Sequence, residues 1–159
     1  MPHKLSQISY RRSHKDDARA VFDLVSASVA RLAPDPYPAE VVATWMSGRS
    51  PADYVADCQG KEIWIAQDGA VPVGFSHGVP GEVVRLFVAA SQTGKGVGVG
   101  LFERALADAR TSWDGPVTIE ATLNAVPFYK RFGFVEVGPS IFGGRDPELP
   151  AIKTVILKG

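Results

Sequence analysis

The chain has 159 residues, of which 45% are hydrophobic and 21% are charged, and its 17 basic side chains balance its 17 acidic ones. This composition is typical of one globular domain, and the lack of any block of like charge argues against a broad basic face for nucleic acid. No run approaches the ~20 apolar residues of a membrane span, residues 1–12 lack the apolar core of a signal peptide, and a single cysteine, Cys58, excludes an intrachain disulfide. We therefore expect one cytoplasmic domain over residues 1–159, without nucleic-acid or membrane partners.

The first third of the chain is predicted to be mainly helical. A short strand over Ile8 to Arg12 precedes a helix over Asp16 to Arg31, in which apolar side chains recur every three or four residues. Three prolines between Pro34 and Pro38 then break the chain, because proline removes a helix hydrogen bond. Two short helices are expected next, over Pro38 to Met46 and from Ser50 to about Cys58.

An antiparallel meander follows. Its three predicted strands cover Glu62 to Ala66, Val71 to Val79 and Glu82 to Val88. Asp68-Gly69 and Pro80-Gly81 are typical turn sequences and separate them.

The last third returns to alternating helix and strand. The expected elements are a helix over Gly98 to Thr111, a strand over Val117 to Ala121, a short helix from Asn124 to Gly133, and strands over Phe134 to Val137 and Ile152 to Leu157. The crossover rule makes the Val117 strand parallel to the Glu82 strand, and residues 138–150 are expected to form a loop. This order predicts a mixed α/β domain.

The segment after Val88 is the most informative in the chain. It carries glycines at positions 94, 96, 98 and 100, between a predicted strand and a predicted helix. Such a junction presents bare backbone N–H groups beside the positive end of a helix dipole, which suits a phosphate or pyrophosphate.

Two well-known phosphate-binding motifs, the P-loop and the dinucleotide fingerprint, can be compared with this segment. A P-loop would need glycine where Ala89 stands and serine or threonine where Gly96 stands, so it is excluded. A dinucleotide fingerprint lacks its third glycine in both registers, where Val99 or Leu101 stands. It stays open in a weak form, because Glu120 lies at a suitable distance for a ribose contact.

Two motifs resemble the GNAT superfamily of N-acetyltransferases. Thr93-Gly94-Lys95-Gly96-Val97-Gly98 resembles the family's pyrophosphate loop, usually written Q/R-x-x-G-x-G/A, with Thr93 in place of Gln or Arg. Asn124-Ala125-Val126-Pro127-Phe128-Tyr129, continuing to Gly133-Phe134, resembles the family's later block. The resemblance implies the GNAT fold (α+β), with a mostly antiparallel sheet of about six to seven strands and helices on both faces.

The resemblance also implies acetyl-CoA as co-substrate and a set of residues that bind it. Backbone N–H groups from Gly94 to Gly98, including Lys95 and Val97, would hold the pyrophosphate. Leu86, Phe87 and Val88 occupy the strand that splays from its neighbour in the family, pairs with pantetheine and polarises the thioester carbonyl. Asn124 falls where the family contacts the cofactor near the pantetheine arm, although a helix cap also explains this residue.

Catalytic roles follow from the same resemblance. Tyr129 falls where many members carry a tyrosine that protonates the departing thiolate, and its alternative is a core aromatic. Glu82 is the candidate base, with a surface glutamate as its alternative. His77 is the rival base, because imidazole titrates near neutral pH, and its alternative is an exposed strand histidine. Cys58 is expected to be a bystander.

Partners follow less directly. Histidine and cysteine spacing predicts no metal. The family's acceptor groove would map to residues 31–38 and 138–150, with Tyr37, Asp35, Arg145, Asp146 and Glu148 as possible contacts to an amine. We expect acetyl transfer to a primary amine by direct attack, with a homodimer possible. The alternatives are a non-catalytic acyl-CoA-binding sensor or scaffold, and an acyltransferase for longer acyl groups.

Overall fold

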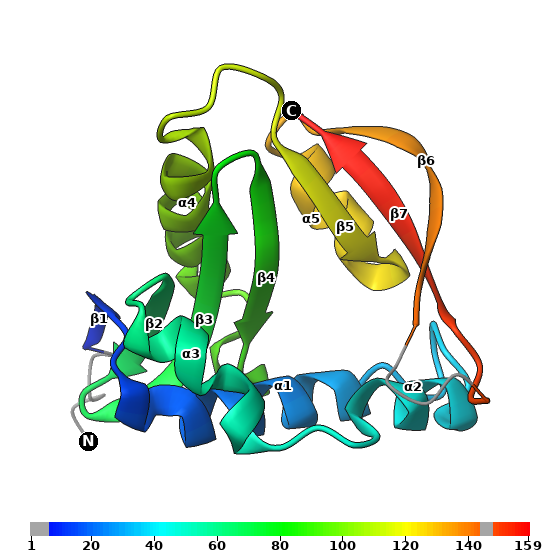
Figure 1. Ribbon diagram of the computed structural model, residues 1–159, viewed down its shortest axis with the longest axis horizontal. Coiled ribbons are helices and arrows are strands. Elements are labelled where there is room, and N and C mark those ends of the chain that lie inside the picture. Colours follow the sequence, from blue (N-terminus) through cyan, green and yellow to red (C-terminus); the bar gives the residue numbers. More distant parts are fainter. Residues whose placement is uncertain (1–6, 144–147) are drawn as a thin grey trace, which may run out of the picture.

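A computed structural model describes residues 7–143 and 148–159 of the chain. Its seven strands form one sheet in the order β1-β2-β3-β4-β5-β7-β6 (Figure 1). The strands are β1 (Ile8–Arg12), β2 (Ile63–Asp68), β3 (Val71–Val79), β4 (Glu82–Val88), β5 (Thr118–Thr122), β6 (Val135–Phe142) and β7 (Ile152–Lys158). All neighbours are antiparallel except β4 and β5, as the crossover rule predicts. The predicted mixed, mostly antiparallel sheet is confirmed.

Helices cover both faces of the sheet. The α-helices are α1 (Ala18–Ala30), α2 (Ala39–Met46), α3 (Val55–Gln59), α4 (Val97–Arg110) and α5 (Val126–Lys130). Because successive strand residues point to opposite faces, Ile65 packs under α1 while its neighbour Ala66 packs under α4. On the far half of the sheet, Ile119 and Leu157 share a core with Phe102 of α4 and Tyr129 of α5.

Two glycines of β3 let α4 approach the sheet closely. A Cβ atom at Gly78 would lie 2.0 Å from the carbonyl oxygen of Ala105, and one at Gly74 would lie 2.9 Å from Leu101 Cδ1. The Ser76 hydroxyl, on the same face between them, donates to the Leu101 carbonyl oxygen at 2.8 Å. The strand-helix unit that carries the glycine loop is therefore fixed by contacts that larger side chains would prevent.

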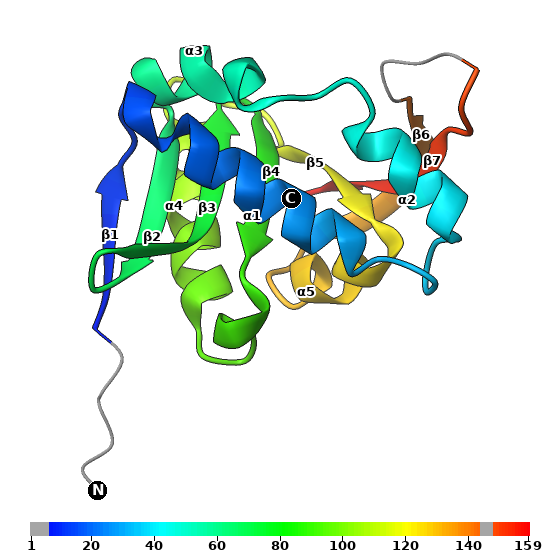
Figure 2. The same cartoon turned by 90° about the horizontal axis from the view of Figure 1, so that it is seen from below.

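The sheet opens between its two parallel strands. Register pairing between β4 and β5 covers only Glu82 with Thr118 and Val83 with Ile119, after which the strands diverge (Figure 1). The other half of β4 remains paired with β3, from Arg85 to Val88. A strand-lined opening is thus built into the centre of the sheet. Figure 2 shows α1 crossing β3 and β4 on one face of the sheet, with α5 toward the opposite side.

The main error of the sequence prediction concerns residues 138–150. Instead of ending at Val137, β6 continues to Phe142 through Gly138 and Pro139. This is possible because β6 is an edge strand, where the missing N–H of proline costs no sheet hydrogen bond, and because a register shift between Glu136 and Gly138 absorbs the irregularity. None of the helices in the described ranges combines the length and apolar content that a membrane crossing needs.

Candidate active site

The glycine loop forms a turn that leads directly into α4. Gly94 and Gly96 have φ angles of +79° and +83°, and Gly96 is the N-cap residue of the helix. These left-handed conformations explain why glycine stands at both positions. The N–H of Lys95 donates to the Gln92 carbonyl oxygen at 3.2 Å, whereas no backbone acceptor within the described ranges bonds to the N–H of Gly94 or Gly96.

The first turn of α4 adds further donors to this loop. Val97 and Gly98 are the first helical residues, so their N–H groups have no partner within the helix. Thr93 is exposed, while its neighbour Gln92 is buried, with a side-chain oxygen that lacks a partner in the described part of the chain. Gln92 is therefore less accessible than Thr93 to a ligand on the exposed loop.

A cavity of about 310 Å³ lies in the opening between β4 and β5, and we call it the strand cavity. It gathers residues that the sequence placed at a cofactor site, namely Leu86, Phe87, Val88, Thr93 and Asn124. Asn124 is exposed and makes no capping hydrogen bond, because Ala125 is the N-cap residue of α5. The helix-cap explanation of Asn124 is therefore wrong, and its amide lines the strand cavity.

The backbone groups of Leu86, Phe87 and Val88 in β4 do not all face the same side of the strand. The Ala89 N–H donates to Val73 of β3, and alternate residues of a strand direct their backbone groups to opposite sides. Leu86 and Val88 therefore direct theirs toward the opening, while the backbone of Phe87 faces β3. Arg31, at the end of α1, donates to the Val88 carbonyl oxygen at 2.9 Å, which confirms that this group faces away from β3.

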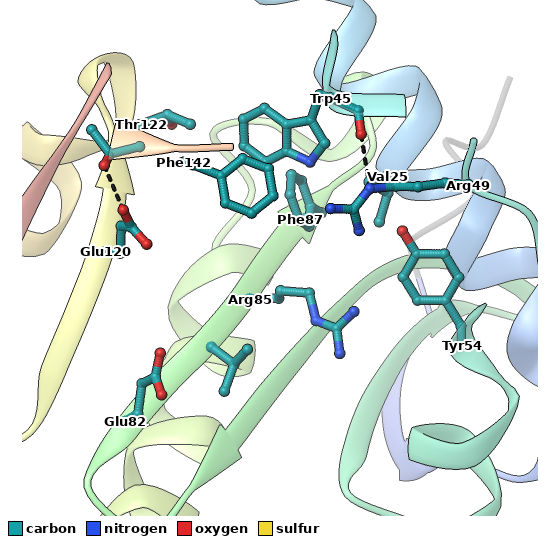
Figure 3. A pocket seen from close by; sticks show the side chains of 12 residues that line it. Val25, Trp45, Arg49, Tyr54, Glu82, Arg85, Phe87, Glu120, Thr122 and Phe142 are labelled. Carbon is teal, nitrogen blue, oxygen red and sulfur yellow. Dashed lines mark hydrogen bonds between the residues drawn. The ribbon is translucent and has the colours of Figure 1, made fainter. Parts of the chain in front are cut away.

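A second cavity of about 320 Å³ adjoins the first, and we call it the aromatic cavity (Figure 3). Its apolar walls include Trp45 of α2, Tyr54, Phe87 and Phe142. Phe87 and Thr122 line both cavities, so the two spaces meet at these side chains.

Four charged side chains line the aromatic cavity. Glu82 comes from the start of β4 and is exposed, as the surface alternative for this residue expected, yet it also borders the cavity. Glu120 of β5 accepts a hydrogen bond from the buried Thr154 hydroxyl at 2.6 Å. Two arginines, Arg49 and Arg85, complete the set (Figure 3).

His77 lies behind Arg85 and borders neither cavity. It is 4% exposed, which contradicts the alternative of an exposed strand histidine. Its Nδ1 accepts from the Arg85 guanidinium at 3.0 Å, and its Nε2 lies 3.1 Å from the Glu62 carboxylate. Burial, and next the charge of Arg85, lower the pKa of His77 and favour the neutral ring.

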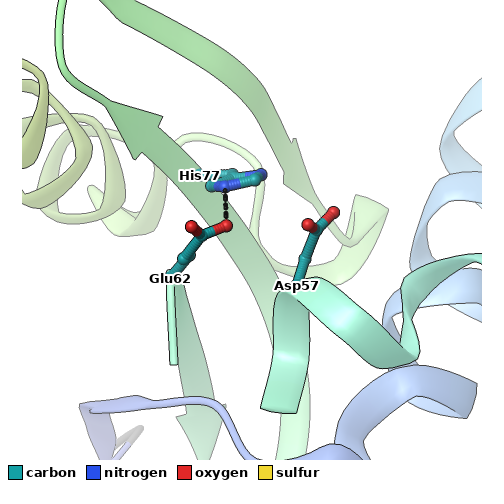
Figure 4. Close-up of side chains that lie close together, drawn as sticks. All are labelled: Asp57, Glu62 and His77. Carbon is teal, nitrogen blue, oxygen red and sulfur yellow. Dashed lines mark hydrogen bonds and ion pairs between the residues drawn. The ribbon is translucent and has the colours of Figure 1, made fainter. Parts of the chain in front are cut away.

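Asp57, Glu62 and His77 form a cluster in which one ligand-type atom from each lies within 4.8 Å of the others (Figure 4). Sequence spacing gave no sign of it, because the residues come from α3, the following loop and β3. Arg85 donates to Asp57 at 2.6 Å and to His77 Nδ1. The hydrogen bonds from Arg85, together with the contact between His77 Nε2 and Glu62, account for the arrangement of these side chains.

Tyr129 is 6% exposed and its ring packs 5.5 Å from that of Phe102 and 5.3 Å from that of Phe128. Burial raises the pKa of its phenol well above the ordinary value, so the group stays protonated. Tyr129 is not among the residues that line the two cavities. Its core role is established by these contacts, and its role as an acid stays a prediction.

The expected acceptor contacts are mostly elsewhere. Tyr37 is buried, and its hydroxyl donates to the Lys153 carbonyl oxygen and accepts from the Leu123 N–H, so it is structural. Asp35 and Glu148 border neither cavity, and Arg145 and Asp146 lie outside the described residues. Cys58 is fully buried, and burial raises the pKa of its thiol to about 11, which agrees with the expected bystander role.

A family model of the acetyltransferase (GNAT) domain matches residues 32–144. The chain belongs to the GNAT acetyltransferase family. This GNAT protein is 23% identical over 133 residues to the uncharacterized N-acetyltransferase YafP of Escherichia coli strain K12, covering 84% of its own length and 85% of that relative. The predicted family is thereby confirmed.

Solved structures show the same GNAT fold. A GCN5-related N-acetyltransferase from Rhodopseudomonas palustris, also described as a class-II aminotransferase, superposes with a TM-score of 0.82 at 22% identity, covering 99% of this chain and 98% of that one. The acetyltransferase yncA from Salmonella typhimurium, solved with acetyl-CoA, has a TM-score of 0.70 at 13% identity, with 97% and 94% covered.

Sequence reasoning missed three residues of the aromatic cavity, namely Arg49, Tyr54 and Phe142. Arg49 follows α2, Tyr54 ends a short 3-10 helix, and Phe142 lies in the segment predicted as loop. An alternation of apolar residues through Val135, Val137 and Ile141 was the available signal that β6 continues.

Proposed function

We propose that this GNAT protein transfers an acetyl group from acetyl-CoA to a primary amine while both substrates are bound. The observation that carries the proposal is the meeting of two cavities at Phe87 and Thr122. One substrate in each cavity places the acyl carbon beside the amine, so that direct attack needs no covalent enzyme intermediate.

The strand cavity is assigned to acetyl-CoA. The pyrophosphate would rest on the N–H groups of Gly94, Gly96, Val97 and Gly98, where the helix dipole adds favourable charge. Pantetheine would then run along Leu86 and Val88, whose backbone groups face the opening. Of these, the Leu86 N–H lies nearer to Glu82 along the strand, and it is our candidate for polarising the thioester carbonyl.

Glu82 is proposed as the base, because it borders the aromatic cavity and His77 does not. The amine nitrogen attacks the carbonyl carbon, its proton passes to the Glu82 carboxylate directly or through water, and the carbon–sulfur bond breaks. Glu120 is a second carboxylate in the same cavity, held by Thr154.

Tyr129 is proposed to return a proton to the departing thiolate. Its burial keeps the phenol protonated, and the same burial opposes loss of that proton. The transfer therefore requires a thiolate that is equally desolvated, because desolvation also raises the pKa of a thiol. Asn124 and Ala125, just before α5, line the strand cavity and connect this helix with the donor site.

The decisive experiment is calorimetric titration with acetyl-CoA and with coenzyme A, followed by turnover of a panel of amines read as released thiol. Binding with turnover supports the proposal. Binding without turnover on any amine would favour a non-catalytic acyl-CoA-binding module, and no binding would overturn the assignment of the strand cavity. Propionyl-CoA in parallel tests for longer acyl groups.

A further inference from the structure

Charges in the aromatic cavity are separated in space. Arg85 points toward Tyr54 and Arg49 reaches into the cavity beside Phe87, whereas Glu82 and Glu120 lie at the β4–β5 side (Figure 3). Glu82 pairs in register with Thr118 of β5, which places both carboxylates near the same pair of strands. A ligand that spans the cavity meets cations at one end and anions at the other.

The two arginines are not equivalent. Arg85 donates to Asp57 at 2.6 Å and stacks 5.4 Å from the Tyr54 ring, so its charge is already balanced. Among the described residues, Arg49 donates only through Nε, to the Trp45 carbonyl oxygen at 2.8 Å. None of the ion pairs within 4.0 Å in the described ranges includes Arg49, and its terminal nitrogens point into the cavity (Figure 3).

Packing fixes the free end of Arg49. The guanidinium carbon lies 5.5 Å from the centroid of the Phe142 ring, and that ring packs 5.1 Å from Trp45. A planar guanidinium held by its Nε still presents a pair of terminal donors, which match the oxygens of a carboxylate or phosphate. Arg49 is therefore preorganised for an anion.

Size limits the occupant. A volume of about 320 Å³ is at the lower end of the range for small-molecule sites, and aromatic rings form much of the wall between the charged ends. Such a space suits one small molecule with an apolar middle.

From these observations we infer that the acceptor is a small zwitterion, an amine that also carries an anionic oxygen group bound by Arg49. The amine end lies at Glu82 and Glu120, and Glu120 is two residues before Thr122, the β5 residue that lines both cavities and marks where the acetyl group arrives. This inference rests on the proposed acetyl transfer and names the class of its acceptor.

The test uses matched acceptors that differ only in the anion. L-Phenylalanine is compared with 2-phenylethylamine, and O-phosphoethanolamine with ethanolamine, each with acetyl-CoA and thiol detection. We expect one anionic member to exceed its uncharged partner in kcat/KM by roughly 10- to 100-fold, the range for one charge-assisted hydrogen-bonded contact. The pair that shows the preference distinguishes a carboxylate from a phosphate.

Arg49→Gln should remove that preference, so that the ratio of kcat/KM within the pair falls toward one, while Arg49→Lys should restore part of it. Arg19→Gln removes the same net charge from an exposed position that borders neither cavity, and its ratio should match the parent. A ratio that falls equally in Arg19→Gln would overturn the inference, because the effect would then be long-range.

Failure of the proposed function is distinguishable from failure of this inference. Calorimetry of the coenzyme A complex with each acid measures binding without turnover. Acetylation of uncharged amines with no anion preference overturns the inference alone. If an anionic amine binds, Arg49→Gln abolishes this binding and no amine is acetylated, the anion site is supported and the proposed acetyltransferase activity is overturned. If the protein neither binds these acids nor acetylates any amine, both the inference and the proposed function are overturned.

Discussion

Two alanine substitutions in the glycine loop should shift stability in opposite directions. Gly96 has φ +83°, and no atom lies within 4 Å of the position that a methyl group would take there, so Gly96→Ala meets only the backbone cost of the left-handed conformation, about 1–2 kcal/mol. Gly98 is helical, and its Cβ would make ordinary contacts at 3.7 Å with Phe128 and Val88. Gly98→Ala should therefore stabilise α4 by about 0.5–1 kcal/mol, because glycine is a poor helix former.

The cost at Gly96 must appear either in folding or in binding. If Gly96→Ala keeps the native loop, the free energy of unfolding falls by the full amount, which lowers Tm by about 2–4 °C per kcal/mol for a chain of this length. If the loop relaxes to another conformation, the native one must be restored when coenzyme A binds. The same 1–2 kcal/mol then weakens affinity by roughly 5- to 30-fold.

Thermal unfolding and calorimetry with coenzyme A measure the two parts on the same protein samples. Gly138→Ala is the control, because Gly138 also has open space around its Cβ position but no positive φ. If Gly96→Ala matched the parent in both Tm and affinity, or if the two loop variants shifted Tm in the same direction, the conformational argument for this loop would be refuted.

Three further predictions concern the site and its surroundings. Tyr129→Phe should lower kcat more than it weakens acetyl-CoA binding in calorimetry, and an unchanged kcat would remove Tyr129 as the acid. The pKa of His77 is lower in the folded protein than in the unfolded chain, so the unfolded chain binds the proton more readily and the free energy of unfolding should fall as pH drops below about 6.5. His77→Gln should reduce the dependence of this free energy on pH, measured by denaturant titrations. If the pH dependence of stability persisted unchanged in His77→Gln, it would have to come from other titratable groups. The Cys58 thiol should resist a disulfide reagent at pH 8 in the native state and react once per chain in denaturant, and rapid native reaction would contradict its burial.

Local sequence signals were sufficient for most of the fold. The strands β1, β3 and β4 have the predicted bounds, and α4 begins one residue before the predicted helix. β6 was predicted too short because Gly138 and Pro139 are local loop signals, whereas tolerance of proline depends on the strand lying at an edge. That position is a property of the whole sheet, which local pattern does not contain.

The site divides in the same way. The donor residues lie in two contiguous motifs, so Leu86, Val88, Thr93 and Asn124 were found together. The aromatic cavity draws its lining from α1, α2, η2 (Pro51–Tyr54), three central strands and β6, and no short segment contains its pattern. Arg49 has no motif around it, and its relation to Phe142 arises only from folding.

The sheet is joined by only a short seam between β4 and β5, although α4 packs a shared core across it. Only two residue pairs join the strand halves, so other contacts must hold them together. Arg31 binds Val88 on one side, and Tyr37, six residues later, binds Leu123 and Lys153 on the other. Residues 31–37 therefore connect the two sides of this seam through side-chain hydrogen bonds. We expect amide hydrogen exchange in β5 to become faster when these contacts are removed.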